Sequence, residues 1–357
     1  MPTLYRVLLT GANGYIAQHI LAQLLETGHS VLGVVRSQSK VEALTKTFGR
    51  YINTPQLDFS IVPDITTPGA FDTVLQSTPP FDIVLHTASP FFFRATRGAD
   101  FLHPAIKGTT EILEGIARVA PSVKRVVVTS SFAAIGDMGG SPISNPPRIY
   151  TRDDWNPVTM EQAMETEDPM ITYPASKTFA EKAAWDFVKE GKGDFELATI
   201  NSAYVVGPLY DPSQIATLEG INESVARIYK LLLHPDRKPS DPVPASLIYL
   251  WADVRDVARA HLLAMTRPEA AGKRWFVTAG DLGMQQIVNY LREALPEKRD
   301  TIPIGDPKKL EKPEGWYGAS APETERVLGL KYISAEESIK DLAPQLLEIE
   351  KRDAASP

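Results

Sequence analysis

Cysteine is absent from the 357 residues of the sequence, and long apolar runs are absent as well. Without cysteine the chain has no disulfide framework, no thiol nucleophile and no cysteine-based zinc site. No apolar stretch reaches the length of about 18 residues that a membrane span requires, and the N-terminal residues lack the pattern of a secretion signal. We therefore expect a cytoplasmic protein with no membrane partner.

An excess of positive charge is also missing. The 44 Asp and Glu residues outnumber the 37 Lys and Arg residues, which leaves a net charge of −7. A chain with this charge has no general attraction for nucleic acid, so we expect no such partner. His86, His103 and His261 have no carboxylate at metal-ligand spacing, and we expect no metal site. The sequence leaves monomer and homodimer equally open.

Short apolar runs alternate with amphipathic stretches in the first half of the chain, which is typical of strand–helix–strand units. β-branched runs such as Val126–Val128 favour buried central strands. We expect strands at residues 6–10, 30–35, 57–62, 83–87, 125–129 and 197–202. The predicted fold class is α/β, a Rossmann-type doubly wound parallel sheet with a smaller C-terminal region.

Prolines become frequent after Gly207, and the regular alternation is lost there. We expect the sheet domain to span residues 1–206 and to be completed by about residues 246–280. The remaining residues, 207–245 and 281–357, would form the second region. Within these parts the apolar spacing predicts helices at 253–265 and 284–295, a strand at 274–279, and a final helix from a capping box at Ser334 to Leu347.

A glycine turn, TGANGYIA at residues 10–17, follows the first predicted strand and leads into a helix. Gly11 permits a tight turn, and Gly14 lets the backbone approach a pyrophosphate at the helix N-terminus. Ala17 replaces the third glycine of the dinucleotide motif and is still small. The alternative is a glycine-rich turn without a ligand. The strand–turn–helix context favours dinucleotide binding.

Two cations follow the second predicted strand, where an NAD-binding protein has an acidic residue for the ribose. Arg36 ends that strand and Lys40 comes four residues later. Because cations suit a 2′-phosphate, the sequence favours NADPH over NADH; the alternative is a solvated basic strand end. Asp64, after the third strand, either contacts the adenine or only caps its loop.

Tyr173 and Lys177 form a Tyr-x-x-x-Lys pattern at the start of an amphipathic helix. The i, i+4 spacing places phenol and ammonium on one face. The cation stabilises a phenolate, which makes the tyrosine a better proton donor at neutral pH. The alternative is a surface pair between Lys177 and Glu181. Because of Pro174, we expect Tyr173 at or just before the helix start.

Serines end the fifth predicted strand, at Thr129-Ser130-Ser131. Ligands of parallel sheets sit at the carboxyl ends of strands, so a hydroxyl there can bind a carbonyl oxygen. Serines also end strands without any function.

Taken together, these features resemble the extended short-chain dehydrogenases/reductases. The sequence is most similar to their dihydroflavonol-reductase-like branch and to the fungal NADPH-dependent ketoreductases, nearly from end to end. The resemblance implies that Ser131, Tyr173 and Lys177 are the catalytic trio, with Ser131 rather than Ser130 in the family's position. Ser202 replaces a proline of the relatives, in a loop that contacts the nicotinamide.

The resemblance also implies a set of residues that line the cofactor, in addition to Tyr173 and Lys177. These are Gly11, Asn13, Gly14, Tyr15, Ile16, Arg36, Lys40, Asp64, Ile65, Thr87, Ala88 and Val205. Aromatic residues after strand ends are expected to form the wall of the substrate pocket, with core packing as the alternative. They are Phe91, Phe92, Phe93, Phe132 and Tyr204.

The expected function is NADPH-dependent reduction of a small-molecule ketone or aldehyde to an alcohol, with the second region binding the substrate. One alternative is a nucleotide-sugar epimerase or dehydratase with NAD. Another is a regulator that senses a dinucleotide without catalysis, although such binders have generally lost the tyrosine or the lysine.

Overall fold

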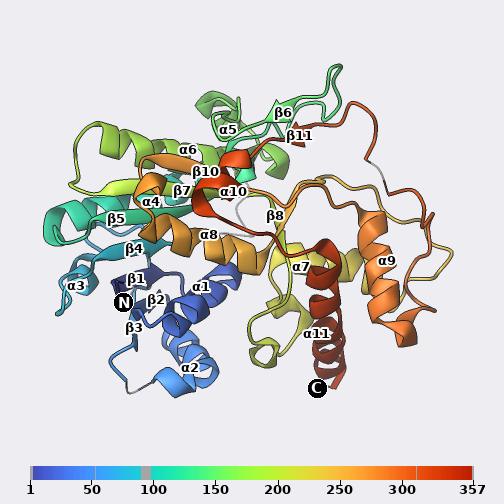
Figure 1. The fold of residues 1–357 in the computed structure, drawn as a ribbon, viewed down its shortest axis with the longest axis horizontal. Coiled ribbons are helices and arrows are strands. Elements are labelled where there is room, and N and C mark those ends of the chain that lie inside the picture. The colour runs from blue at the N-terminus through green and yellow to red at the C-terminus, as the bar shows by residue number, and fades with distance from the viewer. Residues whose placement is uncertain (1–2, 53, 90–97, 311, 356–357) are drawn as a thin grey trace.

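The structure is a computed structural model that describes residues 3–52, 54–89, 98–310 and 312–355. A seven-stranded parallel sheet lies at its centre (Figure 1), in the order β10-β7-β5-β4-β1-β2-β3. Its strands are β1 (Arg6–Thr10), β2 (Ser30–Val35), β3 (Leu57–Ile61), β4 (Ile83–His86), β5 (Arg125–Ser131), β7 (Glu196–Ser202) and β10 (Lys273–Val277). The predicted fold class is confirmed, and the strand bounds differ from the prediction by at most two residues.

The strand order reverses between β1 and β4, because β2 and β3 extend the sheet to one side and β4 to the other. In open α/β sheets the crevice at the carboxyl ends of the two strands flanking such a reversal is the usual ligand site. Gly11 follows β1 and Thr87 follows β4. The glycine turn therefore lies at this crevice.

Helices cover both faces of the sheet, since alternate strand residues point to opposite sides. Leu9 and Leu85 pack with α1 (Tyr15–Glu26), α2 (Gln38–Thr47) and α8 (Val254–Thr266) on one face. Leu8 and Val84 pack with α3 (Asp72–Leu75), α4 (Gly98–Val119) and α6 (Pro169–Lys189) on the other. The first face thus holds the glycine-turn helix and the second the Tyr-x-x-x-Lys helix.

A second hydrophobic core lies beside the sheet and joins α7 (Glu223–Ile228), α9 (Met284–Ala294) and α11 (Ala335–Ala355), which gather on the right of Figure 1. The short strands β8 (Tyr204–Val206) and β9 (Trp251–Asp253) pair next to it. The remaining elements are β6 (Ile149–Tyr150), β11 (Gly318–Ala319), α5 (Met160–Glu165) and α10 (Pro322–Leu328). Helix α11 runs beyond the predicted end at Leu347, and Ile349 is still buried.

No helix in the described ranges is both long enough and apolar enough to cross a membrane.

Four histidines are buried, His19, His29, His86 and His261, and burial lowers the pKa of each. The pKa of His19 and of His261 falls to about 4, and that of His86 to about 3. Burial raises the pKa of the Asp256 carboxyl to about 7. Near pH 5.5 the unfolded chain therefore binds more protons at the histidines, while Asp256 binds one more in the folded state.

We expect the free energy of unfolding to decrease as the pH falls below about 6.5, the ordinary pKa of histidine. His19, His86 and His261 together with Asp256 leave a net excess of roughly two protons in the unfolded state, and His29 adds to it, so the slope is at least about 2.5 kcal/mol per pH unit near pH 5.5. Urea unfolding measured from pH 8 to pH 5 tests this. His261→Gln should reduce the slope by about one proton, whereas His103→Gln, at an exposed position, should leave it unchanged. If the free energy of unfolding depended equally on pH in both variants, the contribution assigned to His261 would be wrong.

Candidate active site

The glycine turn joins β1 to α1 in a backbone conformation that requires glycine at its first position. Gly11 has φ of +66°, and the Gly14 N–H donates to the Gly11 carbonyl at 2.8 Å. A Cβ on Gly11 would lie 2.9 Å from the Cα and backbone nitrogen of Ala88. The turn therefore packs directly against the chain that leaves β4.

Helix α1 begins at this turn with an N-terminus suited to an anion. Gly14 is the N-cap and supplies no side-chain cap, and the first turn contains no acidic residue. The first N–H groups of a helix have no partner within it and carry partial positive charge. A phosphate group can accept hydrogen bonds there.

The side chains at the start of α1 hold the helix to its surroundings. The Tyr15 hydroxyl donates to the Gly207 carbonyl at 2.7 Å, and burial raises the pKa of Tyr15 well above its ordinary value. Ile16 packs against the first core, and the Asn13 carbonyl accepts from Gln18 Nε2 at 3.1 Å. Tyr15 thus connects the glycine-turn helix to the segment after β8.

Arg36 and Lys40 lie at the carboxyl end of β2. Arg36 is exposed, and Lys40 is in the first turn of α2. Neither forms an ion pair with any residue that the structure describes, and the first turn of α2 has no acidic residue. Both cations are available to an anionic group.

The other predicted cofactor residues follow strand ends at the same edge of the sheet. The Asp64 carboxylate accepts from the Thr66 hydroxyl at 2.7 Å, and this hydrogen bond lowers the pKa of Asp64. Ile65 is next to it and half-buried. Asp64 thus caps its own loop and is exposed, and its contact with the adenine stays a prediction.

Thr87 and Ala88 follow β4 and are hydrogen-bonded to β1. The Thr87 hydroxyl donates to the Thr10 carbonyl at 2.5 Å, and the Ala88 N–H donates to the Thr10 hydroxyl at 3.2 Å. Val205 is in β8. Ser202 ends β7 in regular pairing with Ser131 and Val277, so serine continues the strand at this position.

Tyr173 and Lys177 lie on one face of α6, and both are half-buried. The ammonium nitrogen of Lys177 lies 5.9 Å from the centroid of the Tyr173 ring. It donates to the Ser89 hydroxyl at 3.4 Å, and Ser89 follows Thr87 and Ala88. The pair therefore faces the chain that leaves β4.

The predicted position of Tyr173 in its helix is wrong. Helix α6 begins at Pro169, with Asp168 as the N-cap accepting from the Met170 N–H at 2.9 Å. Tyr173 lies in the second turn, and Pro174 is inside the helix. The Asp168-Pro169 start signal, an N-cap residue followed by proline, lies one turn before the tyrosine.

The two serines at the end of β5 have different surroundings. Ser130 is buried and its hydroxyl donates to Glu181 Oε2 at 2.5 Å. Ser131 is half-buried, and its hydroxyl accepts from the Ala133 N–H at 3.1 Å, in the 3₁₀ turn η2 (Phe132–Ala134) that packs on α6. Ser131 is therefore more accessible than Ser130 and lies next to the helix of Tyr173 and Lys177.

A surface pair between Lys177 and Glu181 is not formed. The Glu181 side chain is only 1% exposed and pairs with Arg274, whose Nε lies 2.6 Å from Glu181 Oε1. No sequence motif predicts a functional role for Glu181 or Arg274. Glu181 precedes Ala184 and Val188 by three and seven residues, a spacing that indicates the buried side of the helix.

The predicted aromatic pocket wall is only partly described by the structure. Phe132 is 3% exposed, and its ring stacks on Phe276 at a centroid distance of 5.4 Å. It lies in a core cluster with Tyr150 and Tyr317, so the prediction that it forms an open pocket wall is wrong. The Tyr204 hydroxyl donates to the Ser224 carbonyl at 2.6 Å. Residues Phe91–Phe93 lie outside the described residues.

Groups of three or more potential metal ligands do not occur among the side chains that the structure describes.

The model of the NAD dependent epimerase/dehydratase family matches residues 7–278 of the chain. The ketoreductase azaE of Aspergillus niger is 39% identical over 345 residues, which are 96% of this chain and 98% of that protein. The NADPH-dependent methylglyoxal reductase of Saccharomyces cerevisiae is 39% identical over 354 residues, 97% and 99% of the two chains.

Solved structures show the same likeness. The yeast methylglyoxal/isovaleraldehyde reductase complexed with NADPH superimposes with a TM-score of 0.88 at 38% identity, covering 97% of this chain and 99% of that one. The homologous reductase of Candida albicans in complex with NADPH has a TM-score of 0.88 at 36% identity and covers 97% and 99%.

Proposed function

Because the chain belongs to the NAD dependent epimerase/dehydratase family, the extended short-chain dehydrogenases/reductases, we propose that it is an NADPH-dependent carbonyl reductase that converts a ketone or aldehyde to an alcohol. The observation that carries the proposal is the placement of Tyr173 and Lys177 on one helix face, beside the residues that follow β4 and the glycine turn. Three relatives that match over nearly the whole chain are named as reductases, two of them with NADPH in their names.

The residues of the crevice fit NADPH. A Cβ on Gly11 would clash with the backbone of Ala88, so only glycine permits this close turn, and the N-terminus of α1 has no side-chain cap. Gly11, Gly14 and the first N–H groups of α1 would hold the pyrophosphate. Arg36 and Lys40 would hold the 2′-phosphate, since neither has an ionic partner in the described part of the chain.

The other cofactor contacts are proposed for residues that border the same crevice. These are Asn13, Tyr15, Ile16, Asp64, Ile65, Thr87, Ala88 and Val205.

Three side chains would perform the proton chemistry. NADPH supplies, when bound, the hydride that is added to the carbonyl carbon. The Tyr173 hydroxyl donates a proton to the carbonyl oxygen, and Ser131 orients that oxygen by a hydrogen bond. The Lys177 ammonium stabilises the phenolate that Tyr173 becomes and would also hold the nicotinamide ribose. The protein contributes mainly positioning and electrostatic stabilisation.

The division of labour within the chain is also a proposal. Residues 1–206, completed by about 246–280, would hold the cofactor, and residues 207–245 and 281–357 would bind the substrate. Tyr204 would border the substrate on the side of this second region. The absence of cysteine fits function in the reducing cytoplasm, which localisation of a fluorescent fusion would test.

Initial rates with NADPH and NADH on a panel of ketones and aldehydes test the function. We expect turnover with NADPH on at least part of the panel. Inactivity toward every simple carbonyl, combined with turnover of a nucleotide sugar, would favour the epimerase. Tight NADPH binding without turnover of any compound would instead favour a dinucleotide sensor.

Removing both cations, in Arg36→Ala/Lys40→Ala, should raise the KM for NADPH by about 10- to 100-fold, because two charge-assisted contacts to phosphate are lost. The KM for NADH should change little, since NADH has no 2′-phosphate. Steady-state kinetics with both cofactors measure this. Lys46→Ala is the matched control, because Lys46 is an exposed cation in the last turn of the same helix. An equal loss with both cofactors would contradict the assignment.

A further inference from the structure

Glu181 is a buried carboxylate in α6 that accepts hydrogen bonds from side chains of four other residues besides Arg274. Oε2 accepts from the Ser130 hydroxyl at 2.5 Å and from Asn201 Nδ2 at 2.6 Å. Oε1 accepts from the Thr199 hydroxyl at 2.9 Å and from Trp185 Nε1 at 3.2 Å. Both oxygens are therefore fully used inside the protein, and Glu181 is not directed to a ligand.

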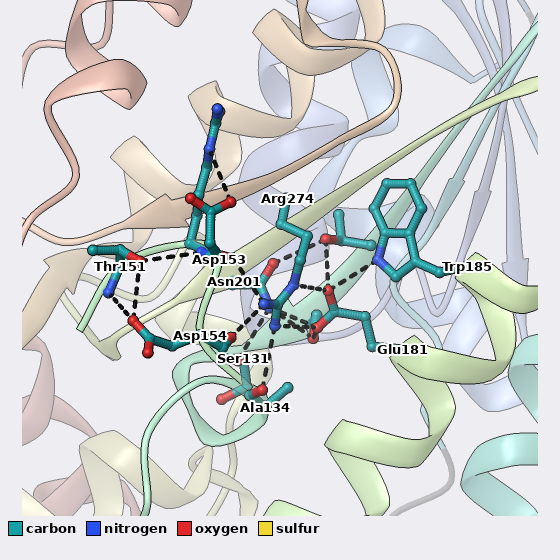
Figure 2. A network of polar contacts seen from close by, with 12 residues as sticks. Ser131, Ala134, Thr151, Asp153, Asp154, Glu181, Trp185, Asn201 and Arg274 are labelled. Atoms are coloured by element: carbon teal, nitrogen blue, oxygen red, sulfur yellow. Dashed lines mark hydrogen bonds and ion pairs between the residues drawn. The ribbon is translucent and has the colours of Figure 1, made fainter. Parts of the chain in front are cut away.

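Arg274 extends this network from β10 toward the proposed catalytic residues. Besides Glu181, its guanidinium donates to the carbonyls of Arg152 at 2.7 Å and Ala134 at 3.2 Å, and also to the carbonyl of Asp154. It also lies 3.7 Å from the centroid of the Trp155 ring. Figure 2 shows the guanidinium between Glu181 and the segment that contains Ala134.

The network joins elements that are distant in the sequence. In the sheet, Ser130 pairs with Asn201 and Thr199 pairs with Arg274. Residues opposite each other, and residues two apart on one strand, point to the same face. All four side chains therefore meet Glu181 on the face that α6 covers. We call Ser130, Glu181, Thr199, Asn201 and Arg274 the Glu181 network.

The Glu181 network borders the proposed catalytic groups at Ser131 and at Lys177. Ser130 is adjacent to Ser131, and Asn201 Nδ2 also donates to the Ser131 carbonyl at 3.4 Å. Glu181 follows Lys177 by one helical turn. Lys177 and Glu181 line one cavity of about 20 Å³.

The energetics of a buried ion pair such as Glu181–Arg274 favour a role in fixing geometry over a role in stabilising the fold. Taking a carboxylate and a guanidinium out of water costs several kcal/mol per ion, so a buried pair is often no more stabilising than apolar residues of similar volume. What the pair supplies is a defined relative position, because its hydrogen bonds are directional and charge-assisted.

We propose that the Glu181 network is a positioning device, which holds the end of β5 with Ser131 in register with the helix that carries Tyr173 and Lys177. This inference rests on the proposed reductase function. Glu181 and Arg274 are positioning residues, since they contact other protein groups. A displacement of about 1 Å in a reacting group can lower a rate about a hundredfold.

Two test variants, one conservative variant and one control test the proposal. Arg274→Met should lower kcat about 10- to 100-fold, and the milder Ser130→Ala about 3- to 10-fold, while the Kd for NADPH changes less than about threefold. With NADPH deuterated at the transferred position, the isotope effect on kcat should increase. Arg274→Lys should restore part of kcat, since it keeps the charge but loses the planar donor fork.

Arg125→Met is the matched control. Arg125 and Arg274 have side chains 9% and 10% exposed, and each pairs with a glutamate. Arg125 lies at the opposite end of β5 from Ser131. Because Glu196 is 61% exposed and Glu181 only 1%, we expect this control to lose less stability than Arg274→Met in thermal unfolding and to keep kcat within about twofold of the wild type.

Hydrogen–deuterium exchange gives a readout without turnover. In Arg274→Met and Ser130→Ala the amides of residues 132–135 should exchange at least about tenfold faster, and in Arg125→Met they should not. The proposal is overturned if, in both test variants, kcat stays within about twofold of the wild type and the amides of residues 132–135 exchange at the wild-type rate. A wild-type protein inactive on every carbonyl would overturn the proposed function instead, and the exchange measurement would then decide whether the network orders this segment.

Discussion

Tyr173→Phe is expected to lower kcat for carbonyl reduction by about 10²- to 10⁴-fold, the range for removing a general acid. The phenylalanine ring keeps the volume of the tyrosine and removes the only atom that can donate the proton. The Kd for NADPH should change little, because the crevice residues from Gly11 to Ala88 are untouched. Stopped-flow or steady-state kinetics together with a cofactor titration measure both quantities.

Tyr173→Phe needs a check of the fold, since Tyr173 is half-buried in α6. Thermal unfolding and circular dichroism should show a change of only a few degrees. A variant that keeps more than a few per cent of wild-type turnover with an intact fold would show that another group donates the proton. Phe179→Leu in the same helix controls for a general effect of altering α6.

Gly11→Ala should weaken NADPH binding at least about tenfold and lower the melting temperature. The added Cβ would lie 2.9 Å from two backbone atoms of Ala88, so the turn or the chain after β4 must move. The left-handed conformation costs a non-glycine residue roughly 1–2 kcal/mol in addition. Both effects act where the pyrophosphate is proposed to bind.

Gly272→Ala separates these two effects. Gly272 has φ of +67°, nearly the same as Gly11, and a Cβ there meets no atom within 4 Å. This control should show only the conformational cost, as a small decrease in melting temperature, with unchanged NADPH affinity. Thermal unfolding with and without NADPH measures both, because a ligand that binds only the folded state raises the melting temperature. Equal NADPH affinity for the two variants would place the pyrophosphate elsewhere.

Much of the proposed cofactor crevice can be predicted from the sequence because its determinants are local. The glycine turn, the cations after β2 and the Tyr-x-x-x-Lys spacing each depend on residues within one or two turns of one another. The strands were predictable for the same reason, since alternating and β-branched apolar runs have a fixed period. The strand order places the predicted cofactor segments at one crevice.

Local patterns left alternatives open where the outcome depends on contacts between distant segments. Phe132 follows a strand end, as a pocket residue would, but Phe276 and Tyr317 enclose it from other parts of the chain. Lys177 and Glu181 have the spacing of a surface pair, but Arg274 competes for the carboxylate. Phe276, Tyr317 and Arg274 are distant in the sequence, so the local pattern does not reveal these contacts. The start of α6 is a different case. Its N-cap Asp168 is a local signal, but Pro174 indicated a helix start at Tyr173.

The amino-acid sequence by itself therefore determined the α/β class, the glycine turn and the spacing of phenol and ammonium, because helix and strand periods and the freedom of glycine are properties of short segments. The tertiary structure alone decided which serine of β5 is buried against Glu181 and which carbonyls Arg274 holds. These contacts depend on the register of β5, β7 and β10, which brings together residues more than 70 positions apart, and no local period encodes that register.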